Sequence, residues 1–379
     1  MNNPRIASIE WGVLEGLRPR NAGCNSRLPD HGPTMRDAIA RVTLEDGTSG
    51  FGFSRVKQPQ AEALIGQRLD ELISVEQGVT AAGLPIEFPL WDLLGQRTGK
   101  PVYALAAEYY GKSLDGPQQA KCYDTTLYFD DLHIASDEEA SQLIAEEARQ
   151  GWERGHRAFK MKVGRGGLHM PLEAGTARDI AVIHAVRDAV GPDAPLMVDA
   201  NNGWNVNLVK RVLTETADCH LFWLEEPFHE DPVLYGHLQN WMRERGLLVL
   251  LADGEGHAAA PLLDWAQAGA IDVIQYDLRD IGLTKWLKVG QKLDSWSVRS
   301  APHNYGSNFG NHASCHLSGV IEHFTFVEWD HADTPGLDTS AYSLSEGQIN
   351  VPDAPGFGLA LDDAIFQLVV QRDGYQVSA

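Results

Sequence analysis

Two short apolar runs in the middle of the chain each end in a carboxylate. Residues 196–198 lead directly to Asp199, and residues 221–224 lead directly to Glu225. Each run is long enough for a buried strand, and the segment between them has room for one helix with a turn on either side. In a β–α–β unit the carboxyl ends of both strands lie on one face, where ligands bind. Two carboxylates on that face repel each other unless a cation lies between them, so the sequence predicts a divalent metal site.

Further ionisable residues follow the other predicted strands at similar intervals. The interval is close to the roughly 30 residues that one β/α unit takes in a barrel of eight units. One functional group therefore arrives per strand, and all of them are expected at the same mouth of a barrel. In chain order they are Lys160 with Lys162, Asp199, Glu225, Glu255, Asp277, His303 and Glu328.

Three carboxylates on consecutive strands are the predicted metal ligands. Asp199, Glu225 and Glu255 supply oxygen atoms only, and water with substrate oxygens would complete an octahedron. All-oxygen ligation suits Mg²⁺ better than zinc. Each acid alone is equally well explained as a surface or helix-capping residue, but three in series are not. Asp253 lies two residues before Glu255 and is an alternative third ligand.

Two lysines and a histidine are the candidate bases. Side chains on a strand repeat every two residues, so Lys160 and Lys162 point the same way. Two neighbouring ammonium groups lower each other's pKa, which leaves one lysine able to act as a base. Asp277, one strand before His303, is expected to hydrogen-bond the imidazole and raise its basicity. The alternatives are a solvated basic strand end and a structural histidine.

Two more polar residues are candidates for contact with a substrate. Glu328 ends the last predicted strand and can hold a substrate oxygen or donate a hydrogen bond to a developing enolate. Asn201 follows Asp199 in the same loop, from where its amide can hydrogen-bond the substrate. Both are expected at the mouth that carries the other ionisable residues.

Strands alternate with helices through the central part of the chain. This alternation predicts a parallel barrel or an open doubly wound sheet. No GxGxxG motif opens a helix after the first strand, so a dinucleotide-binding domain has little support. Strands are expected at 121–128, 156–163, 196–198, 221–224, 247–251, 271–275, 298–301 and 324–327, and helices at 140–152, 174–190, 208–216, 235–245, 259–268 and 284–293.

The N-terminal region has a different pattern. A strand is predicted over residues 4–19, a loop over 21–33 and a hairpin over 38–54, and a helical pattern follows over 59–94. Strands first and helices after are typical of an α+β domain. The tail from residue 335 is rich in Gly and Pro, has short strand-like pieces, and is expected to fold back over this first domain.

Composition and charge exclude several classes of protein. The chain is 43% hydrophobic and 22% charged, with a net charge of −21, which argues against a nucleic-acid-binding surface. The four cysteines are far apart and form no CxxC pair, so we expect free thiols in a reducing compartment. No signal peptide and no apolar window of about 18 residues is apparent, so we expect no membrane association and a cytoplasmic location.

The set of strand-end residues resembles the enolase superfamily, and within it the mandelate racemase-like group. The resemblance implies an α+β capping domain at 1–118, a modified (β/α)₇β barrel at 119–334 and a C-terminal segment at 335–379 that rejoins the cap. It rests on KMK at 160–162, VDANNGW at 198–204, WLEEP at 223–227, GE at 254–255, Asp277, His303, VEWD at 327–330, and LWDLLGQRTGKPVYAL at 90–105 as the link from cap to barrel.

This resemblance implies Mg²⁺-dependent chemistry at the carbon next to a carboxylate. Mg²⁺ stabilises the enediolate that forms when the α-proton leaves, with Lys162 on one face and the Asp277–His303 pair on the other. Dehydration of a sugar acid, an aldonate or aldarate, to a 2-keto-3-deoxy acid is the favoured reaction. Racemisation or epimerisation of a 2-hydroxy acid by two bases is the alternative. A muconate-type cycloisomerase would need a lysine where Asp277 stands.

The same resemblance places substrate recognition in the loop at 21–33. Arg27 is expected to hold a distal carboxylate, and His31 with Asp30 would suit hydroxyl groups, while Arg36 lies just beyond. A five- or six-carbon acid sugar is therefore the expected small-molecule partner, and we expect a homo-oligomer.

Two hypotheses come from other classes of protein. A Schiff-base aldolase would explain a lysine at a strand end, at Lys160 or Lys162, but not three carboxylates in series. A non-catalytic binding protein on the same scaffold is the other, although no expected functional position is lost from the sequence.

Overall fold

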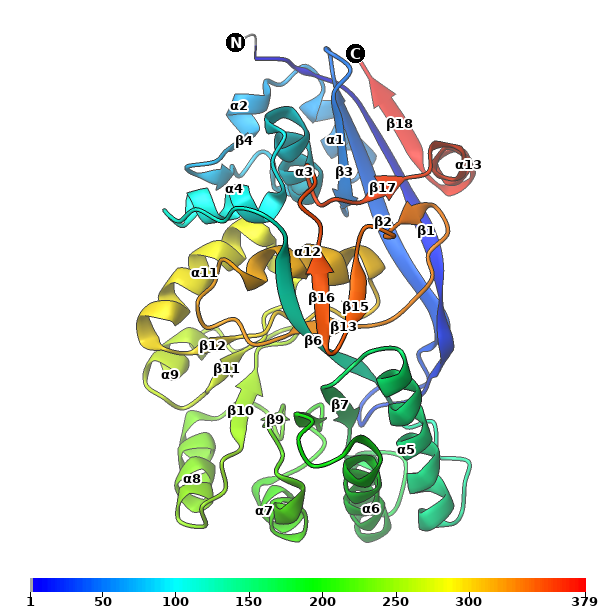
Figure 1. Cartoon of the computed structure of the whole chain (residues 1–379), viewed down its shortest axis with the longest axis vertical. Coiled ribbons are helices and arrows are strands. Elements are labelled where there is room, and N and C mark those ends of the chain that lie inside the picture. The colour runs from blue at the N-terminus through cyan, green and yellow to red at the C-terminus, as the bar shows by residue number, and fades with distance from the viewer. Residues whose placement is uncertain (1–2) are drawn as a thin grey trace.

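The computed structural model describes residues 3–379 and places a parallel barrel beneath a capping domain of strands and helices (Figure 1). Successive barrel strands pair in parallel from the first to the seventh, and the eighth pairs with the first to close the ring. This architecture confirms the predicted modified barrel with an α+β cap. The barrel strands are β6 (Gln118–Leu127), β7 (Phe159–Lys162), β8 (Leu196–Asp199), β9 (Trp223–Glu225), β10 (Leu250–Asp253), β11 (Val273–Ile274), β12 (Arg299–Ser300) and β13 (Val327–Trp329).

Helices follow each of the first seven barrel strands, which is the (β/α)₇β arrangement. Local sequence explains where several of them begin: the side chains of Ser136, Asn205 and Asp231 each accept a hydrogen bond from a backbone N–H of the first turn. These helices are α5 (Asp137–Glu153), α6 (Leu172–Val190), α7 (Val206–Glu215), α8 (Pro232–Arg243), α9 (Leu262–Gln267), α10 (Leu278–Ile281) with α11 (Leu283–Trp296), and α12 (Asn308–Ser318), together with the short 3-10 helices η2 (Arg165–Gly167) and η3 (Ala217–Cys219).

The capping domain is built on a four-stranded antiparallel sheet in the order β18-β1-β2-β3. The predicted strand, loop and hairpin are present, and the hairpin turns at Gly47, whose φ of +83° favours glycine. The helical pattern expected over 59–94 is wrong in its middle, where two very short strands pair. The elements are β1 (Ile6–Ala22), β2 (Gly32–Leu44), β3 (Ser49–Phe53), α1 (Gln58–Leu64), α2 (Leu69–Leu72), β4 (Ile73–Ser74), β5 (Gly78–Val79), η1 (Leu84–Ile86), α3 (Glu87–Thr98) and α4 (Val102–Tyr109).

The C-terminal segment contacts both parts of the molecule. β16 pairs antiparallel with the first half of β6 in the barrel, whereas β18 pairs with β1 in the cap (Figure 1). The domain limits at residues 118 and 334 stay a prediction. The segment contains β14 (Leu337–Asp338), β15 (Ser343–Ser345), β16 (Gln348–Val351), β17 (Ala360–Leu361), α13 (Asp363–Asp373) and β18 (Tyr375–Ser378).

The inside of the barrel is apolar toward the amino ends of the strands and polar toward their carboxyl ends. One buried side chain from each strand or its edge forms a separate apolar cluster, and the ionisable residues follow it toward the carboxyl ends of the strands. This apolar layer keeps water out from beneath the polar residues and so strengthens their electrostatic interactions. Its members are Tyr123, Ala158, Met197, Trp223, Ala252, Val273, Ala301 and Phe326.

No helix within residues 3–379 is both long and apolar enough to cross a membrane.

Candidate active site

Three carboxylates converge at the mouth of the barrel, as the sequence predicts. Asp199 and Glu225 end β8 and β9 and are direct partners in the strand register, which brings their side chains together. Glu255 follows β10, and oxygen atoms of the three residues lie within 4.8 Å of one another. Oε2 of Glu255 is buried and has no hydrogen-bond partner among residues 3–379. A buried carboxylate oxygen without a donor is costly, so this cluster fits a bound cation.

Asp253, the alternative third ligand, is turned away from the cluster. Its carboxylate accepts hydrogen bonds from the Tyr235 hydroxyl and from the backbone N–H of Gly254. Burial raises the pKa of Asp253 to about 7. Gly254 has a φ of +126°, which redirects the chain so that Glu255, and not Asp253, faces the other two acids.

Lys160 lies fully buried among the acids. Its Nζ is 2.6 Å from Oε1 of Glu225, 2.9 Å from Oε1 of Glu328 and 3.8 Å from Oδ2 of Asp199. Burial favours the neutral amine, but the carboxylates of Glu225 and Glu328 override it and raise the pKa of Lys160 well above its ordinary value. The ammonium therefore neutralises part of the negative charge of the cluster.

Lys162 lies two residues after Lys160 on β7, closer to the mouth of the barrel, and pairs with Asp199. Its Nζ is also 5.3 Å from the ring centroid of Tyr128. Burial opposes its charge, but Asp199 raises the pKa of Lys162, while Lys160 acts in the opposite direction. Lys160 thus lowers the pKa of Lys162 as expected, but the net shift is upward, because the attraction of Asp199 outweighs the repulsion of Lys160. Mg²⁺ at the same acids would oppose the rise.

His303 and Asp277 form the predicted pair. The two residues are joined by a parallel bridge between neighbouring strands, and Nδ1 of His303 donates to Oδ2 of Asp277 at 3.0 Å. Its Nε2 is directed at the cluster, 3.4 Å from Glu255 and 3.7 Å from Glu328. Burial works against the imidazolium, yet Glu255, Glu328 and Asp277 together raise the pKa of His303 to about 10.

Glu328 connects the two sides of the site. It accepts hydrogen bonds from the Thr125 hydroxyl at 2.7 Å and from the backbone N–H of Asn304 at 2.9 Å, besides its contact with Lys160. Although burial alone would raise it, Lys160 and His303 lower the pKa of Glu328. An ionised carboxylate only accepts hydrogen bonds, so the expected role of Glu328 as a donor to an enolate does not fit.

Asn201 holds the loop after β8 in place. Its φ is 42°, its backbone N–H donates to Asp199 at 2.8 Å, and its Nδ2 donates to Glu226 at 3.1 Å. Its Oδ1 is buried and lacks a partner within the described part of the chain, so it is free to accept from a substrate hydroxyl. Burial, with the charges of Glu255 and Asp199, raises the pKa of Glu226 to about 9.

The recognition loop between β1 and β2 contributes residues to two different sides of the candidate active site. Arg27 lines a pocket of about 420 Å³ together with Asn201 and Glu255, so the structure brings these three together. His31 lies on the Lys162 side instead, with its ring 5.0 Å from that of Tyr128. Asp30 and Arg36 do not reach the cluster, because Asp30 accepts hydrogen bonds within its own loop and Arg36 pairs with exposed Glu15.

Two stacked tyrosines, Tyr128 and Tyr305, lie beside Lys162 and were not predicted from the sequence. Tyr128 and Tyr305 stack with their centroids 5.3 Å apart, and the guanidinium of Arg18 lies over Tyr305 at 4.8 Å. Arg18 forms a bidentate ion pair with Asp330, at 2.9 and 2.7 Å. Tyr128 follows β6 and Tyr305 follows His303, so position directly after a barrel strand was the available signal.

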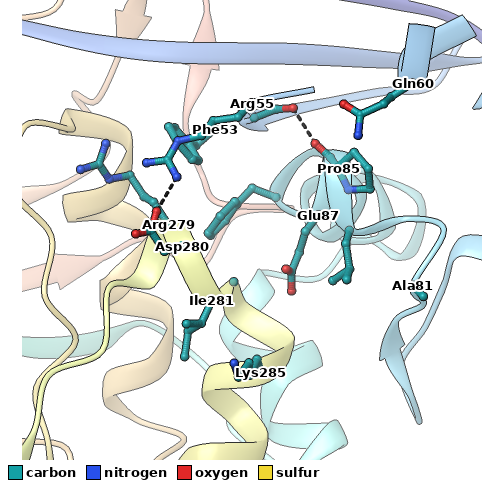
Figure 2. A pocket seen from close by; sticks show the side chains of 14 residues that line it. Phe53, Arg55, Gln60, Ala81, Pro85, Glu87, Arg279, Asp280, Ile281 and Lys285 are labelled. Carbon is teal, nitrogen blue, oxygen red and sulfur yellow. Dashed lines mark hydrogen bonds and ion pairs between the residues drawn. The ribbon is translucent and has the colours of Figure 1, made fainter. Parts of the chain in front are cut away.

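A larger cavity, of about 520 Å³, lies between the cap and the helices that follow β11. Figure 2 shows Arg55 from the cap paired with Asp280, and Glu87 and Lys285 also line this cavity. None of the three converging acids lines it. The chemistry therefore locates the active site at the acid cluster and not in the larger cavity.

Comparison with known proteins agrees with this geometry. Residues 143–365 match the family described as enolase C-terminal domain-like. A galacturonate dehydratase from Geobacillus sp., whose crystal structure contains D-galacturonate and 5-keto-4-deoxy-D-galacturonate, is 44% identical, covers 99% of each chain and has a TM-score of 0.94. A mutant of that dehydratase with bound Mg has a TM-score of 0.96 at the same identity, over 99% of this chain and 97% of that one.

More distant relatives act on related sugar acids. The L-talarate/galactarate dehydratase of Salmonella typhimurium is 25% identical over 86% of this chain and 80% of its own. The 3,6-anhydro-alpha-L-galactonate cycloisomerase of Streptomyces coelicolor is 26% identical over 89% of this chain and 93% of its own. With a matched domain that spans more than half of the sequence, the chain belongs to the enolase superfamily, in its mandelate racemase and muconate lactonizing group.

Proposed function

We propose that this protein is a Mg²⁺-dependent sugar acid dehydratase and that a hexuronate of the galacturonate type is its substrate. The observation that carries the proposal is the placement of Lys162 and the His303–Asp277 pair on opposite sides of one acid cluster. In the sheet, β7 with Lys162 and β12, just before His303, flank the three strands that carry the acids. The full-length identity of 44% to a galacturonate dehydratase supports the choice of substrate.

The acid cluster is the proposed metal site. Asp199, Glu225 and Glu255 would hold Mg²⁺, since all three donors are carboxylate oxygens and one oxygen of Glu255 is buried without a partner in residues 3–379. When bound there, Mg²⁺ supplies positive charge that stabilises the negative charge developing on a substrate carboxylate. Lys160 adds a second, permanent positive charge beneath the same position.

We assign removal of the α-proton to Lys162 and protonation of the leaving hydroxyl to His303. The α C–H bond and the β C–O bond both break, a C=C bond forms between the two carbons, and the hydroxyl leaves as water. The resulting enol takes up a proton at the β-carbon and loses its O–H proton to become a ketone, so the net change is loss of one water molecule. Asp277 holds Nδ1 of His303 and thereby keeps Nε2 directed at the site.

For D-galacturonate the α-carbon is C5 and the leaving hydroxyl is on C4. The product would be 5-keto-4-deoxy-D-galacturonate, the compound bound by the related dehydratase. In this arrangement the carboxylate of the substrate faces the proposed metal site at the acid cluster. The rest of the sugar extends into the pocket lined by Arg27 and Asn201. Arg27 makes no ion pair with any residue of the described chain, so galactarate, whose second carboxylate would meet it, is the second candidate.

A substrate screen tests the proposal. D-galacturonate, galactarate and a set of aldonates are incubated with the protein and Mg²⁺, and keto acid formation is measured while deuterium exchange at the α-carbon is followed by NMR. Product from D-galacturonate that disappears with EDTA and returns with Mg²⁺ supports the proposal. Exchange without keto product would indicate the racemase alternative. No exchange with any acid sugar would contradict proton abstraction altogether and favour a binding protein.

Borohydride trapping separates the aldolase alternative. A lysine that forms a Schiff base becomes covalently attached to a carbonyl substrate on reduction, and peptide mapping would find the adduct at Lys160 or Lys162. We expect no adduct. The homo-oligomeric assembly and the cytoplasmic location stay predictions, and the first is checked by light scattering.

A further inference from the structure

The end of the barrel opposite to the acid cluster carries a second group of metal-binding side chains. His184 comes from α6, and Asp218 with Cys219 come from η3, the short helix that precedes β9. One ligand atom from each of the three lies within 4.8 Å of the others. None of them takes part in the proposed reaction, because β9 runs from this end to Glu225 at the other. In Figure 1, α6 and α7 lie side by side outside the barrel strands.

The distances are close to those of a tetrahedral zinc site. Zinc bonds of about 2.0–2.3 Å separate a ligating nitrogen by about 3.6 Å from a sulfur and by about 3.4 Å from a carboxylate oxygen. Nδ1 of His184 is 3.3 Å from Sγ of Cys219 and 4.0 Å from Oδ2 of Asp218. The Asp218 side chain is 77% exposed, so a rotation about its own bonds can close the remaining gap.

The histidine is already oriented as a metal ligand. Its Nε2 lies 3.0 Å from the backbone oxygen of Glu215, and only an N–H can donate to a carbonyl. In the neutral imidazole, Nδ1 therefore carries the lone pair, and this atom faces Cys219 and Asp218. Ligating histidines typically donate their second nitrogen to a carbonyl or carboxylate in this way.

We propose that His184, Asp218 and Cys219 bind Zn²⁺, with water as the fourth ligand. A nitrogen, an oxygen and a sulfur donor form a ligand set that selects zinc and disfavours Mg²⁺. Binding replaces the thiol proton of Cys219, which passes to the buffer. The ion would link α6 to the segment that leads into β9 and so stabilise the barrel end that carries no catalysis.

A simple hydrogen bond is the competing explanation of the contact. The Cys219 thiol can donate to Nδ1 of His184 without any metal. That explanation does not account for the carboxylate of Asp218 beside the same nitrogen, in a position open to solvent. The side chain of His184 is 38% exposed, so an ion can reach Nδ1 from the surface.

Cobalt titration decides between the two explanations. The full-length protein is saturated with Mg²⁺, Co²⁺ is added, and the thiolate-to-cobalt absorption is recorded, since Co²⁺ on carboxylates alone gives no such band. We expect one equivalent of thiolate-bound Co²⁺, which Zn²⁺ displaces. Absence of the band in the wild-type protein would overturn the proposal.

Variants locate the site. We expect Cys219→Ser to abolish the band and His184→Gln to weaken Zn²⁺ binding by more than about 100-fold, whereas Cys315→Ser, at another buried free cysteine, keeps both. Circular dichroism and unchanged Mg²⁺-dependent turnover confirm that each variant is folded. A band that survives Cys219→Ser, or that is lost equally in Cys315→Ser, would contradict the assignment.

Discussion

The two ends of the barrel offer metal ions opposite kinds of environment. At the carboxyl end, Asp199 and Glu225 are buried and paired with Lys162 and Lys160, which neutralise part of the negative charge of the cluster before any metal binds. At the amino end, the donors are an imidazole, a thiol and one exposed carboxylate, with no lysine or arginine side chain in an ion pair with them in residues 3–379. The carboxyl end therefore brings several charged groups together before any metal binds. The amino end holds one carboxylate, and its thiol must lose a proton before it can bind an ion.

Removal of an acid from the carboxyl end is the change with the largest expected effect. In Glu255→Gln the metal loses a charged ligand, and we expect keto acid formation to fall by about 1,000-fold or more, as several kcal/mol of charge stabilisation are lost. Turnover and Mg²⁺ affinity measure the effect. Asp253→Asn is the matched control, since its side chain bonds Tyr235 and lies outside the cluster. Equal losses in the two variants would contradict the choice of Glu255.

The next effect is expected on the histidine side of the same end. His303→Asn removes the group that protonates the leaving hydroxyl, and we expect a loss of dehydration of about 100- to 10,000-fold. Lys162 remains, so α-deuterium exchange should continue for a substrate of matching configuration. NMR of the substrate measures exchange and product together. Full turnover in this variant would refute the assigned role.

In the metal-free protein, the free energy of unfolding should depend on pH through His303 at the carboxyl end of the barrel. The pKa of His303 is raised to about 10 in the folded chain, against about 6.5 when unfolded, so its stabilising contribution is complete below about pH 6.5. Between these pH values the folded protein holds more protons, and its free energy of unfolding falls as pH rises, by up to about 1.4 kcal/mol per pH unit from this group. Urea unfolding in EDTA should give a flatter profile for His303→Asn, and an unchanged slope would contradict the coupling.

The smallest effect is expected at the amino end. Zn²⁺ at about 100 times its dissociation constant should raise the free energy of unfolding by about 2.7 kcal/mol in the wild type, and not in Cys219→Ser. Turnover should stay within about twofold in both, because no group of the proposed reaction is touched. Chemical denaturation of the Mg²⁺-saturated protein checks this. If Zn²⁺ stabilised both proteins equally, it would be acting at another position.

Strand ends were the most predictable part of this molecule. Asp199 and Glu225 could be paired from sequence because two apolar runs ended in acids and parallel strands share a face. The third acid could not be chosen by spacing, since the answer depends on the positive φ of Gly254. The charge state of Lys160 was also beyond local reasoning, because its partner Glu328 comes from the last barrel strand.

Features outside the strand ends were harder to predict. Tyr128 and Tyr305 look like core aromatics until the fold stacks them beside Lys162. Arg27 and His31 belong to one loop, yet they face different sides of the active site. The composition of the loop does not predict which side each residue faces. His184 and Cys219 follow no recognised ligand spacing and become neighbours only because α6 packs against η3.

The pairing of β18 with β1 imposes an order on how the protein is made. The ribosome releases β1 first and β18 last, although the two lie side by side in the capping sheet. The barrel segments, which lie between them in the chain, can begin to fold while the cap still lacks its edge strand. β18 pairs with Ser8–Trp11, at the end of β1 away from the recognition loop. Loss of β18 should therefore first expose this edge of the capping sheet and reach the substrate-binding side only indirectly.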